Sequence, residues 1–323
     1  MVVEALARQD TVDHAQLEVI VVDDGSVERA ETVLSKLSPP FRLRVLREPH
    51  SGVAKARNAG WRVATGEVVL FLDDDVIPGP GLTLAHASAH AANQDAIVLG
   101  PVSADPARMR DAWNAYEDAI KARKYRALTR SEIPSGIHYG GNFSVRRSYL
   151  DAAGGFDQAL VGNHDVDLGF RFQQMGLRFI FEPSASAIHR GGADLSSWQQ
   201  THLRLGRMDV AMYRERGYAG GLPSLVACYH DRHPFNRVLV RFALVNRGTE
   251  RRVVDACTAA GVAAHRFGLT PLSRGFMSAS ANVLYWAGVR DGLRGNRMLW
   301  DLVRKTRHHS GRPYRRNASR FST

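Results

Sequence analysis

The chain has little cysteine and no apolar run long enough to cross a bilayer. Cys228 and Cys257 are its only cysteines among 323 residues, which excludes a disulfide framework and indicates a reducing compartment. The uncharged stretch Gly275–Val289 has 15 residues, fewer than the roughly 20 that a membrane-spanning helix needs. The N-terminus also lacks the apolar core of a signal peptide. We therefore expect a cytoplasmic protein, or one bound peripherally at the inner face of the membrane.

Internal repeats and low-complexity tracts are also absent, apart from a basic C-terminal tail. Hydrophobic residues make up 44% and charged residues 23% of the sequence, proportions typical of a soluble globular protein. A chain of this length forms one large domain or two. Its charge is uneven, because residues 1–195 carry a net charge of −4 and residues 196–323 a net charge of +15.

One strand ends in three consecutive carboxylates. Residues Glu67–Val76 read Glu-Val-Val-Leu-Phe-Leu-Asp-Asp-Asp-Val, and a short apolar run between turn residues is typical of a buried strand. Ligands bind beyond the carboxyl ends of strands in open α/β sheets. Adjacent carboxylates repel one another unless a cation or ligand hydroxyls offset their charge. Asp73 and Asp75 are therefore candidate ligands for Mg²⁺ or Mn²⁺, although an isolated run of aspartates is more often a solvated turn.

A second acidic strand end lies upstream. The predicted strand Leu17–Val22 runs into Asp23 and Asp24, and a helix is expected over Val27–Leu37, with Ser26 as its N-cap. A strand over Arg42–Leu46 and a helix that opens near residue 52 follow. Strands that alternate with helices in this way predict an α/β fold with a mostly parallel sheet. Two acid-tipped strands of one sheet would face a single cleft.

A series of segments, in order, resembles the motifs of the family 2 glycosyltransferases. These segments are Val21–Ser26, Gly52–Asn58, Phe71–Asp75, Gly140–Arg147, Gly154–Asp157, His164–Arg171 and Phe181–His189. Each is weak alone, and together they cover roughly residues 1–195. The resemblance implies the GT-A fold, a mostly parallel sheet flanked by helices. It also implies the transfer of a sugar from a nucleotide-diphosphate-sugar donor.

The resemblance implies a donor site at the strand ends. Asp24 corresponds to the acid that contacts the nucleotide base or ribose, with Asp23 beside it. Lys55 and Arg57 lie on the helix that flanks this pocket, and simple surface charge is the competing interpretation of both. Asp73 corresponds to the acid that approaches the ribose.

The resemblance also implies a divalent metal, Mn²⁺ or Mg²⁺. Asp75 corresponds to the last acid of the family's Asp-x-Asp motif, which holds the ion on the diphosphate. His189 ends a predicted strand and is a further candidate ligand, as in some GT-A enzymes. Such an ion neutralises a departing diphosphate, so direct inverting attack needs no covalent intermediate.

The acceptor side is implied by two other motifs. Gly141 and Asn142 lie in the motif that lines this side in the family, and Asp165 corresponds to the general base that removes the acceptor's proton. The family usually has Glu where this chain has His164. That histidine either tunes Asp165 or contacts the acceptor, or it is an exposed residue at a helix start.

The beginning of the chain departs from the family pattern. Family members start with a strand and a Pro-Thr-Tyr-Asn loop, whereas Met1–Gln9 resembles the end of the helix that follows them. Absence of this central strand would leave backbone groups unpaired. We therefore expect a misassigned start or a truncation rather than a natural enzyme without the strand.

Helices are expected in the C-terminal part. Their predicted ranges are 195–216, 234–246, 249–266 and 272–290, with breaks at 217–223 and 270–271. The stretch Gly275–Val289 contains Tyr285 and Trp286 between basic flanks, and it is either a membrane-surface helix or a helix packed on the catalytic domain. We expect a catalytic domain over 1–195, a helical region over 196–303 and a disordered basic tail over 304–323 that is attracted to anionic surfaces.

The leading hypothesis is an inverting glycosyltransferase whose acceptor is a glycan or a lipid-linked glycan. A sugar nucleotidyltransferase would share the sheet, but it predicts a glycine-rich phosphate loop that the sequence does not show. A nucleic-acid-binding protein would fit the net charge of +11 and the pI of about 10.1. It would also need basic residues interleaved with aromatics in a recognisable module, so no nucleic-acid partner is expected.

Overall fold

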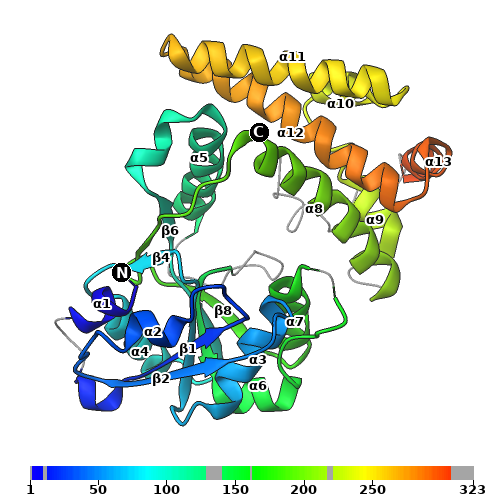
Figure 1. Ribbon diagram of the computed structural model, residues 1–323. Helices are drawn as coiled ribbons and strands as arrows, with labels where there is room; N and C mark the ends of the chain where they lie inside the picture. The colour runs from blue at the N-terminus through cyan, green and yellow to red at the C-terminus, as the bar shows by residue number, and fades with distance from the viewer. Residues whose placement is uncertain (1, 10–12, 129–139, 161, 217–220, 307–323) are drawn as a thin grey trace. The chain divides into compact units, whose positions relative to one another are not determined.

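The chain folds into two compact units in a computed structural model that describes residues 2–9, 13–128, 140–160, 162–216 and 221–306 (Figure 1). The first unit comprises Met1–Asp105 and Lys121–Gly191, and the second comprises Pro106–Ile120 and Gly192–Thr323. The short segment Pro106–Ile120 thus belongs to the second unit, although it lies far from that unit's other residues in sequence. Most of the expected basic tail, from residue 307 onward, lies outside the described residues.

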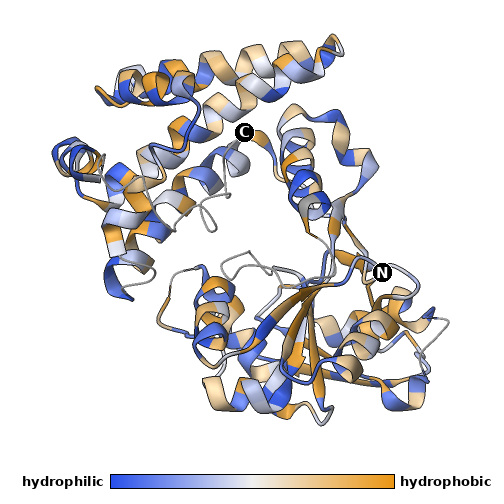
Figure 2. Cartoon of the chain, turned by 180° about the vertical axis from the view of Figure 1, so that it is seen from behind, coloured by the Kyte–Doolittle hydropathy of each residue, from blue (hydrophilic) through white to orange (hydrophobic). Residues whose placement is uncertain are grey.

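Nine strands form three sheets within the described part of the first unit. The strand order is β1–β2, then β3–β7–β5–β8, then β4–β9–β6. Their bounds are β1 Glu18–Asp23, β2 Arg42–Arg47, β3 Val68–Leu72, β4 Val76–Pro78, β5 Ala96–Leu99, β6 Val102–Ala104, β7 Asn142–Arg146, β8 Arg178–Phe181 and β9 Ala187–His189. Figure 2 shows the apolar character of the central strands, and the four residues of β5 are all buried.

The α/β class and the helical C-terminal region are confirmed, but the strand pairing is mixed rather than mostly parallel. β1–β2, β5–β8 and β6–β9 are parallel, whereas β3–β7, β5–β7 and β4–β9 are antiparallel. β7 runs antiparallel because Asn142 starts it beside Leu72, where β3 ends. The expectation that β1 and β3 share one hydrogen-bonded sheet is also wrong for the described residues, because β1 pairs with β2 and β3 pairs with β7.

Short helices flank the sheets of the first unit. They are α1 Val2–Ala7, α2 Ala30–Leu34, α3 Val53–Val63, α4 Leu82–Ala92, α6 Arg147–Ala153 and α7 His164–Gln174. A core of aromatic residues fixes this arrangement: Phe71 stacks on Phe143 with ring centroids 4.8 Å apart and meets the edge of Phe156 at 5.1 Å. α2 is shorter than expected, and its N-cap is Arg29 rather than Ser26.

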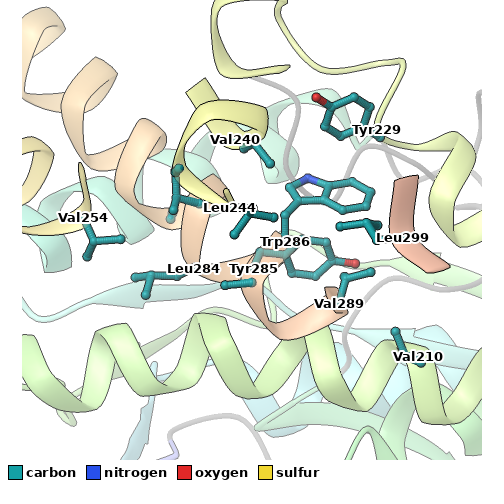
Figure 3. Packing of buried hydrophobic residues seen from close by; sticks show 14 of the residues in the cluster. Val210, Tyr229, Val240, Leu244, Val254, Leu284, Tyr285, Trp286, Val289 and Leu299 are labelled. Carbon is teal, nitrogen blue, oxygen red and sulfur yellow. The ribbon is translucent and has the colours of Figure 1, made fainter. Parts of the chain in front are cut away.

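Helices alone build the described part of the second unit, apart from a 3-10 turn over Pro106–Arg110. They are α5 Ala112–Ala127, which continues into the first unit, α8 Leu195–Glu215, α9 Gly221–Ala227, α10 Pro234–Ala243, α11 Arg247–Arg266, α12 Thr270–Gly292 and α13 Asn296–Thr306. Figure 3 shows the apolar core around α12, where Trp286 is fully buried and meets the edge of Tyr229 at 5.1 Å. α12 also packs closely on α8, since a Cβ added to Gly288 would lie 2.0 Å from the carbonyl oxygen of Leu203.

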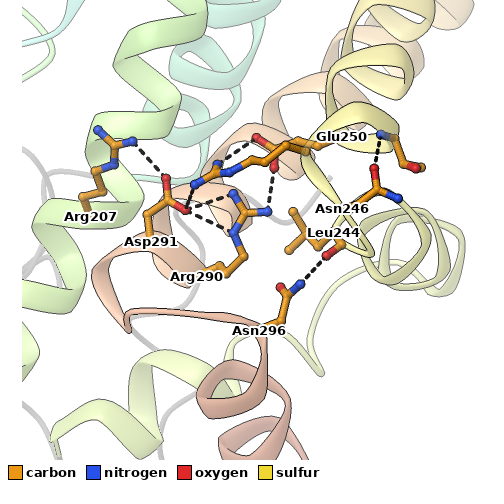
Figure 4. A network of polar contacts seen from close by, with 9 residues as sticks. Arg207, Leu244, Asn246, Glu250, Arg290, Asp291 and Asn296 are labelled. Carbon is orange, nitrogen blue, oxygen red and sulfur yellow. Dashed lines mark hydrogen bonds and ion pairs between the residues drawn. The ribbon is translucent and has the colours of Figure 1, made fainter.

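A charged network links three of these helices (Figure 4). Asp291 accepts hydrogen bonds from Arg207 at 2.9 Å and Arg247 at 2.7 Å, and Arg290 donates to Glu250 at 2.6 Å. The buried guanidinium of Arg290 is therefore paired, as a buried charge must be. The network ties α8, α11 and α12 together.

Burial corrects one interpretation of the C-terminal part. Residues 277–290 of α12 are all buried, so the membrane-surface interpretation of Gly275–Val289 is wrong and this stretch is a packed helix. Apolar side chains that bury against α8, α10 and α11 are not available to lipid. Among the described residues, no helix is long and apolar enough to cross a membrane.

Candidate active site

Asp73 occupies the turn that follows β3 and lies between two other elements. Arg57 on α3 donates a hydrogen bond to Oδ1 of Asp73 at 2.7 Å, and its guanidinium also lies 5.5 Å from the ring of Phe156. On the other side, the backbone N–H of Asp73 donates to the carbonyl of Gly141 at 3.3 Å. Arg57 therefore belongs to the acid turn, rather than being a free surface charge.

Gly141 fits against the Asp73 carboxylate in a way that other residues do not. Its φ angle is 87°, and a Cβ at this position would lie 2.9 Å from Oδ2 of Asp73. Glycine relieves both the backbone strain and the collision. The preceding residue, Gly140, lies near the start of α7, since a Cβ there would lie 3.9 Å from Oδ2 of Asp165. Two adjacent glycines thus bring Asp73 and Asp165 to one turn.

Asn142 is buried rather than open to an acceptor. Its Nδ2 donates to the carbonyl of Ala185 at 2.8 Å, and its Oδ1 lies 2.9 Å from Nε2 of His86. His86 and His90, both on α4, also bond to Ser144 Oγ, at 2.7 and 2.8 Å. Burial lowers the pKa of each histidine to about 4, so both imidazoles are neutral near pH 7. No motif in the sequence predicted this network, which joins α4 to β7 and supports that strand.

Asp75 pairs with His189 at the far end of the acid turn. Its Oδ2 lies 3.1 Å from Nε2 of His189, and both side chains are partly exposed. The pair follows from register, because Val76 of β4 lies opposite His189 of β9. A Cβ on Gly191 would lie 2.3 Å from Oδ2 of Asp75 and 3.0 Å from Nε2 of His189. Because Gly191 has no side chain, space remains beside Oδ2 of Asp75 and Nε2 of His189, an oxygen and a nitrogen donor that suit Mn²⁺.

Asp23 and Asp24 organise the loop after β1. Asp23 accepts hydrogen bonds from the N–H groups of Ser26 at 2.8 Å and Ala30 at 3.1 Å, which lower its pKa to about 2. Arg47 also donates to it at 2.6 Å. These bonds curl residues 26–30 around Asp23 and keep them out of the helix, which explains why α2 starts late.

Asp24 reaches across to the start of α3. It accepts hydrogen bonds from the backbone N–H groups of Ser51 at 2.8 Å and Gly52 at 2.9 Å. Burial raises the pKa of Asp24, but these hydrogen bonds outweigh it, so the pKa lies below its usual value. The negative carboxylate at the N-terminus of α3 also suits the helix dipole.

The first turn of α7 carries two acids with different surroundings. Asp165 is partly exposed. Asp167 is 1% exposed, accepts a hydrogen bond from Nε of Arg171 at 2.9 Å and forms an ion pair with Nη2 of the same residue at 2.7 Å. His164 lies with Nδ1 3.2 Å from the carbonyl of Asp157. Asp165 is thus the more accessible carboxylate, and His164 is fixed beside it.

Some predicted residues are not brought together. Lys55 and Arg57 are about 200° apart around α3 because each helical residue turns by roughly 100°, so the two side chains do not point to one place. Within the described part of the chain, no group of three His, Cys, Asp or Glu side chains forms a complete metal site. The sequence analysis also missed the role of Asn58, which is buried. Its Oδ1 accepts a hydrogen bond from Phe156 N at 2.9 Å and its Nδ2 donates to Phe156 O at 2.7 Å, so it holds the Gly154–Asp157 segment in place.

Comparison with known proteins places this geometry in a family. The family model described as glycosyl transferase family 2 matches residues 2–154. The chain is 33% identical over 223 residues to the succinoglycan biosynthesis protein ExoM of Rhizobium meliloti, covering 66% of this chain and 71% of ExoM. It is 31% identical over 186 residues to the pre-mycofactocin glycosyltransferase of Mycobacterium tuberculosis, covering 56% of this chain and 39% of that relative. The chain therefore spans well under half the length of this second relative.

Solved structures support the fold. The mannosyltransferase PcManGT from Pyrobaculum calidifontis, solved with GDP-Man and Mn²⁺, is 22% identical, with a TM-score of 0.55 over 90% of this chain and 82% of that one. TarS residues 1–349 from S. aureus give a TM-score of 0.51 at 17% identity over 97% of this chain and 88% of theirs. These likenesses confirm the GT-A fold, and no match supports the nucleic-acid-binding alternative.

Proposed function

Because the chain belongs to glycosyl transferase family 2 and is a glycosyltransferase, we propose that it transfers a sugar, with inversion, from a nucleotide-diphosphate-sugar to a hydroxyl of a glycan or lipid-linked glycan. One observation carries this proposal: Gly140 lies against Asp165 and Gly141 lies against Asp73. Asp165, which suits proton removal, and Asp73, which suits donor binding, therefore flank the same pair of glycines.

The donor would bind along the ends of β1 and β3. Asp24 would contact the base or ribose, and Asp23 would shape the loop beside it through its bonds to Ser26 and Ala30. Asp73, oriented by Arg57, would approach the ribose. Lys55 would add positive charge to the pocket from another face of α3, without direct contact with Asp73.

Asp75 and His189 would hold a divalent ion, Mn²⁺ or Mg²⁺, in the space beside Gly191. When bound, the ion supplies positive charge for the diphosphate that departs. The carboxylate and imidazole are 3.1 Å apart without it. The donor's phosphates would complete the coordination, as is usual for such ions.

The acceptor hydroxyl would lose its proton to Asp165. This role requires the hydroxyl to come within hydrogen-bond reach of the carboxylate, and Asp165 is partly exposed at the N-terminal turn of α7. Gly141 and His164 would line the path by which the acceptor approaches. Asn142 would hold the start of β7 in place beside them through its contact with His86. We also propose that the enzyme contacts an anionic membrane surface when its acceptor is lipid-linked.

A donor screen tests the proposal. Thermal unfolding would be followed with UDP-, GDP- and dTDP-sugars, each with Mn²⁺ and with EDTA. One donor class should raise the melting temperature with Mn²⁺ and have little effect with EDTA. The anomeric configuration of the product, read by NMR, tests inversion. Stabilisation by none of these donors, or a product with retained configuration, would contradict the proposal.

A further inference from the structure

α10 presents an apolar stripe to solvent. Phe235, Val238, Phe242 and Val245 are 62%, 70%, 60% and 66% exposed. Phe235, Val238 and Phe242 are three and four residues apart, which places them on one face of the helix, and Val245 follows two residues beyond its end. Large apolar side chains exposed singly are ordinary, but an ordered stripe of four marks an interaction surface.

The opposite face of α10 is fixed to the helical unit. Asn236, Val240 and Ala243 are buried against it, and Nδ2 of Asn296 donates to the carbonyl of Leu244 at 2.6 Å. The helix is therefore already folded and supported. Its exposed stripe is not needed to complete the core of this unit.

The charged residues of α10 itself are all positive. Residues 232–249 contain four arginines and no carboxylate. Arg232 is buried and Arg247 pairs with Asp291, which leaves Arg237 and Arg241 as the cations of α10 itself. The Arg241 guanidinium lies 5.6 Å from the ring of Trp300 on α13, so a half-buried tryptophan adjoins this cationic flank.

These charges decide between possible occupants. A second copy of the chain would meet the stripe by two-fold symmetry, which sets each patch against itself. The α10 helix of the second copy would then offer no carboxylate to these arginines. A surface with exposed Phe and Val and flanking Arg fits anionic lipid, because the apolar side chains enter the acyl boundary while the cations meet the headgroups.

We infer that the apolar face of α10, with Arg237 and Arg241, docks the protein on an anionic bilayer. This inference deepens the membrane contact in the proposed function by naming its surface, and it assigns to α10 the role that the sequence suggested for residues 275–289. Lipid binding by this face requires no donor and no turnover.

Vesicle binding of the full chain tests it. The double variant Phe235→Ser/Phe242→Ser should bind phosphatidylglycerol-containing vesicles at least tenfold more weakly than wild type, and Arg237→Gln/Arg241→Gln should lose most of its preference for them over phosphatidylcholine vesicles. The matched control is Arg266→Gln/Phe267→Ser at the C-terminal end of α11, the end that does not adjoin α10 in the chain. It removes an exposed cation and a phenylalanine that is 80% exposed. The control should bind like wild type.

Other outcomes overturn the inference. Equal vesicle binding by wild type and the Phe235→Ser/Phe242→Ser variant would exclude α10 as the docking face. A wild-type dimer that this variant converts to a monomer in light scattering would show the stripe to be a self-association surface. Donor-dependent thermal stabilisation, which the α10 variants should retain, is measured in parallel, so failure of the donor proposal is recognised separately.

Discussion

Arg57 donates a 2.7 Å hydrogen bond to Oδ1 of Asp73, and so a residue of α3 orients the acid that follows β3. The Arg57 side chain is 16% exposed and that of Asp73 is 39% exposed. The pair is thus held by the protein on one side and open to a ligand on the other. Its two members come from segments that are 16 residues apart in the chain.

Replacement of Arg57 by Gln should weaken donor binding at least tenfold, because Asp73 loses the group that fixes its orientation. Lys55→Gln is the matched comparison, since it removes one positive charge from another face of the same helix. Calorimetric titration with the best donor measures both. If the Lys55 variant loses as much affinity as the Arg57 variant, general charge rather than the Arg57–Asp73 contact would explain the effect.

Asp75→Ala should abolish turnover and donor-dependent thermal stabilisation and leave the fold intact. The carboxylate is partly exposed, and its removal relieves repulsion among three adjacent acids. Asp74→Ala is the control, because Asp74 is exposed in the same turn. The measurement is a Mn²⁺ titration of activity from an EDTA-treated sample. Full activity of the Asp75 variant at the wild-type Mn²⁺ concentration would contradict the metal assignment.

Gly141→Ala should impair donor binding more than backbone strain alone explains. Its Cβ would lie 2.9 Å from the Asp73 carboxylate. Gly154 has a similar φ of 73°, but a Cβ there has no neighbour within 4 Å. Gly141→Ala and the control Gly154→Ala both incur about 1–2 kcal/mol of left-handed backbone strain, whereas only Gly141→Ala displaces Asp73. Equal donor affinities in the two variants would show that Asp73 tolerates the displacement.

Local motifs predicted much of the site because they specify local geometry. The strand before Asp73 and the helix after Gly52 form near the expected positions, since apolar runs and turn residues fix them within a few residues. Contacts between distant segments were harder. Nothing near His86 in sequence indicates that it meets Asn142, 56 residues away, because this contact depends on how α4 packs behind β7.

The helical region shows the same limit. A charge-free stretch such as Gly275–Val289 has the same composition whether it is covered by protein or by lipid, and only packing against α8 and α11 decides which. Conversely, seven of the ten residues of α10 are apolar, and those that form its exposed stripe are recognised only once Asn236, Val240 and Ala243 are known to face inward.

Asp165→Asn should retain donor affinity and lower the transfer rate by roughly 10²–10⁴-fold, the usual contribution of a positioned general base. Asn keeps the shape of the side chain but cannot accept the proton. Asp167→Asn should instead lower the melting temperature, because it leaves the Arg171 guanidinium without its buried anionic partner. Single-turnover rates and thermal unfolding separate the two effects. Loss of donor affinity in the Asp165 variant would move this residue to the donor pocket.

Acid should destabilise the first unit through His86 and His90. Burial lowers the pKa of each to about 4 in the folded chain, whereas an unfolded histidine has a pKa of about 6.5. The unfolded state therefore binds more protons between these values. This contribution to stability is complete above pH 6.5 and is lost as the pH falls towards 4, by up to about 1.4 kcal/mol per pH unit for each histidine.

Urea unfolding at pH 7.5, 6 and 5 measures this dependence. His90→Gln should reduce the slope of unfolding free energy against pH by about 1 kcal/mol per pH unit, because Gln does not titrate. The substitution removes the imidazole that lies 2.8 Å from Ser144 Oγ. The control is Ser88→Gln, which introduces the same side chain at an exposed position of the same helix and removes no titratable group, so the slope should not change. A slope that His90→Gln does not alter, in a variant that still unfolds cooperatively, would show that protonation of His90 does not destabilise this unit.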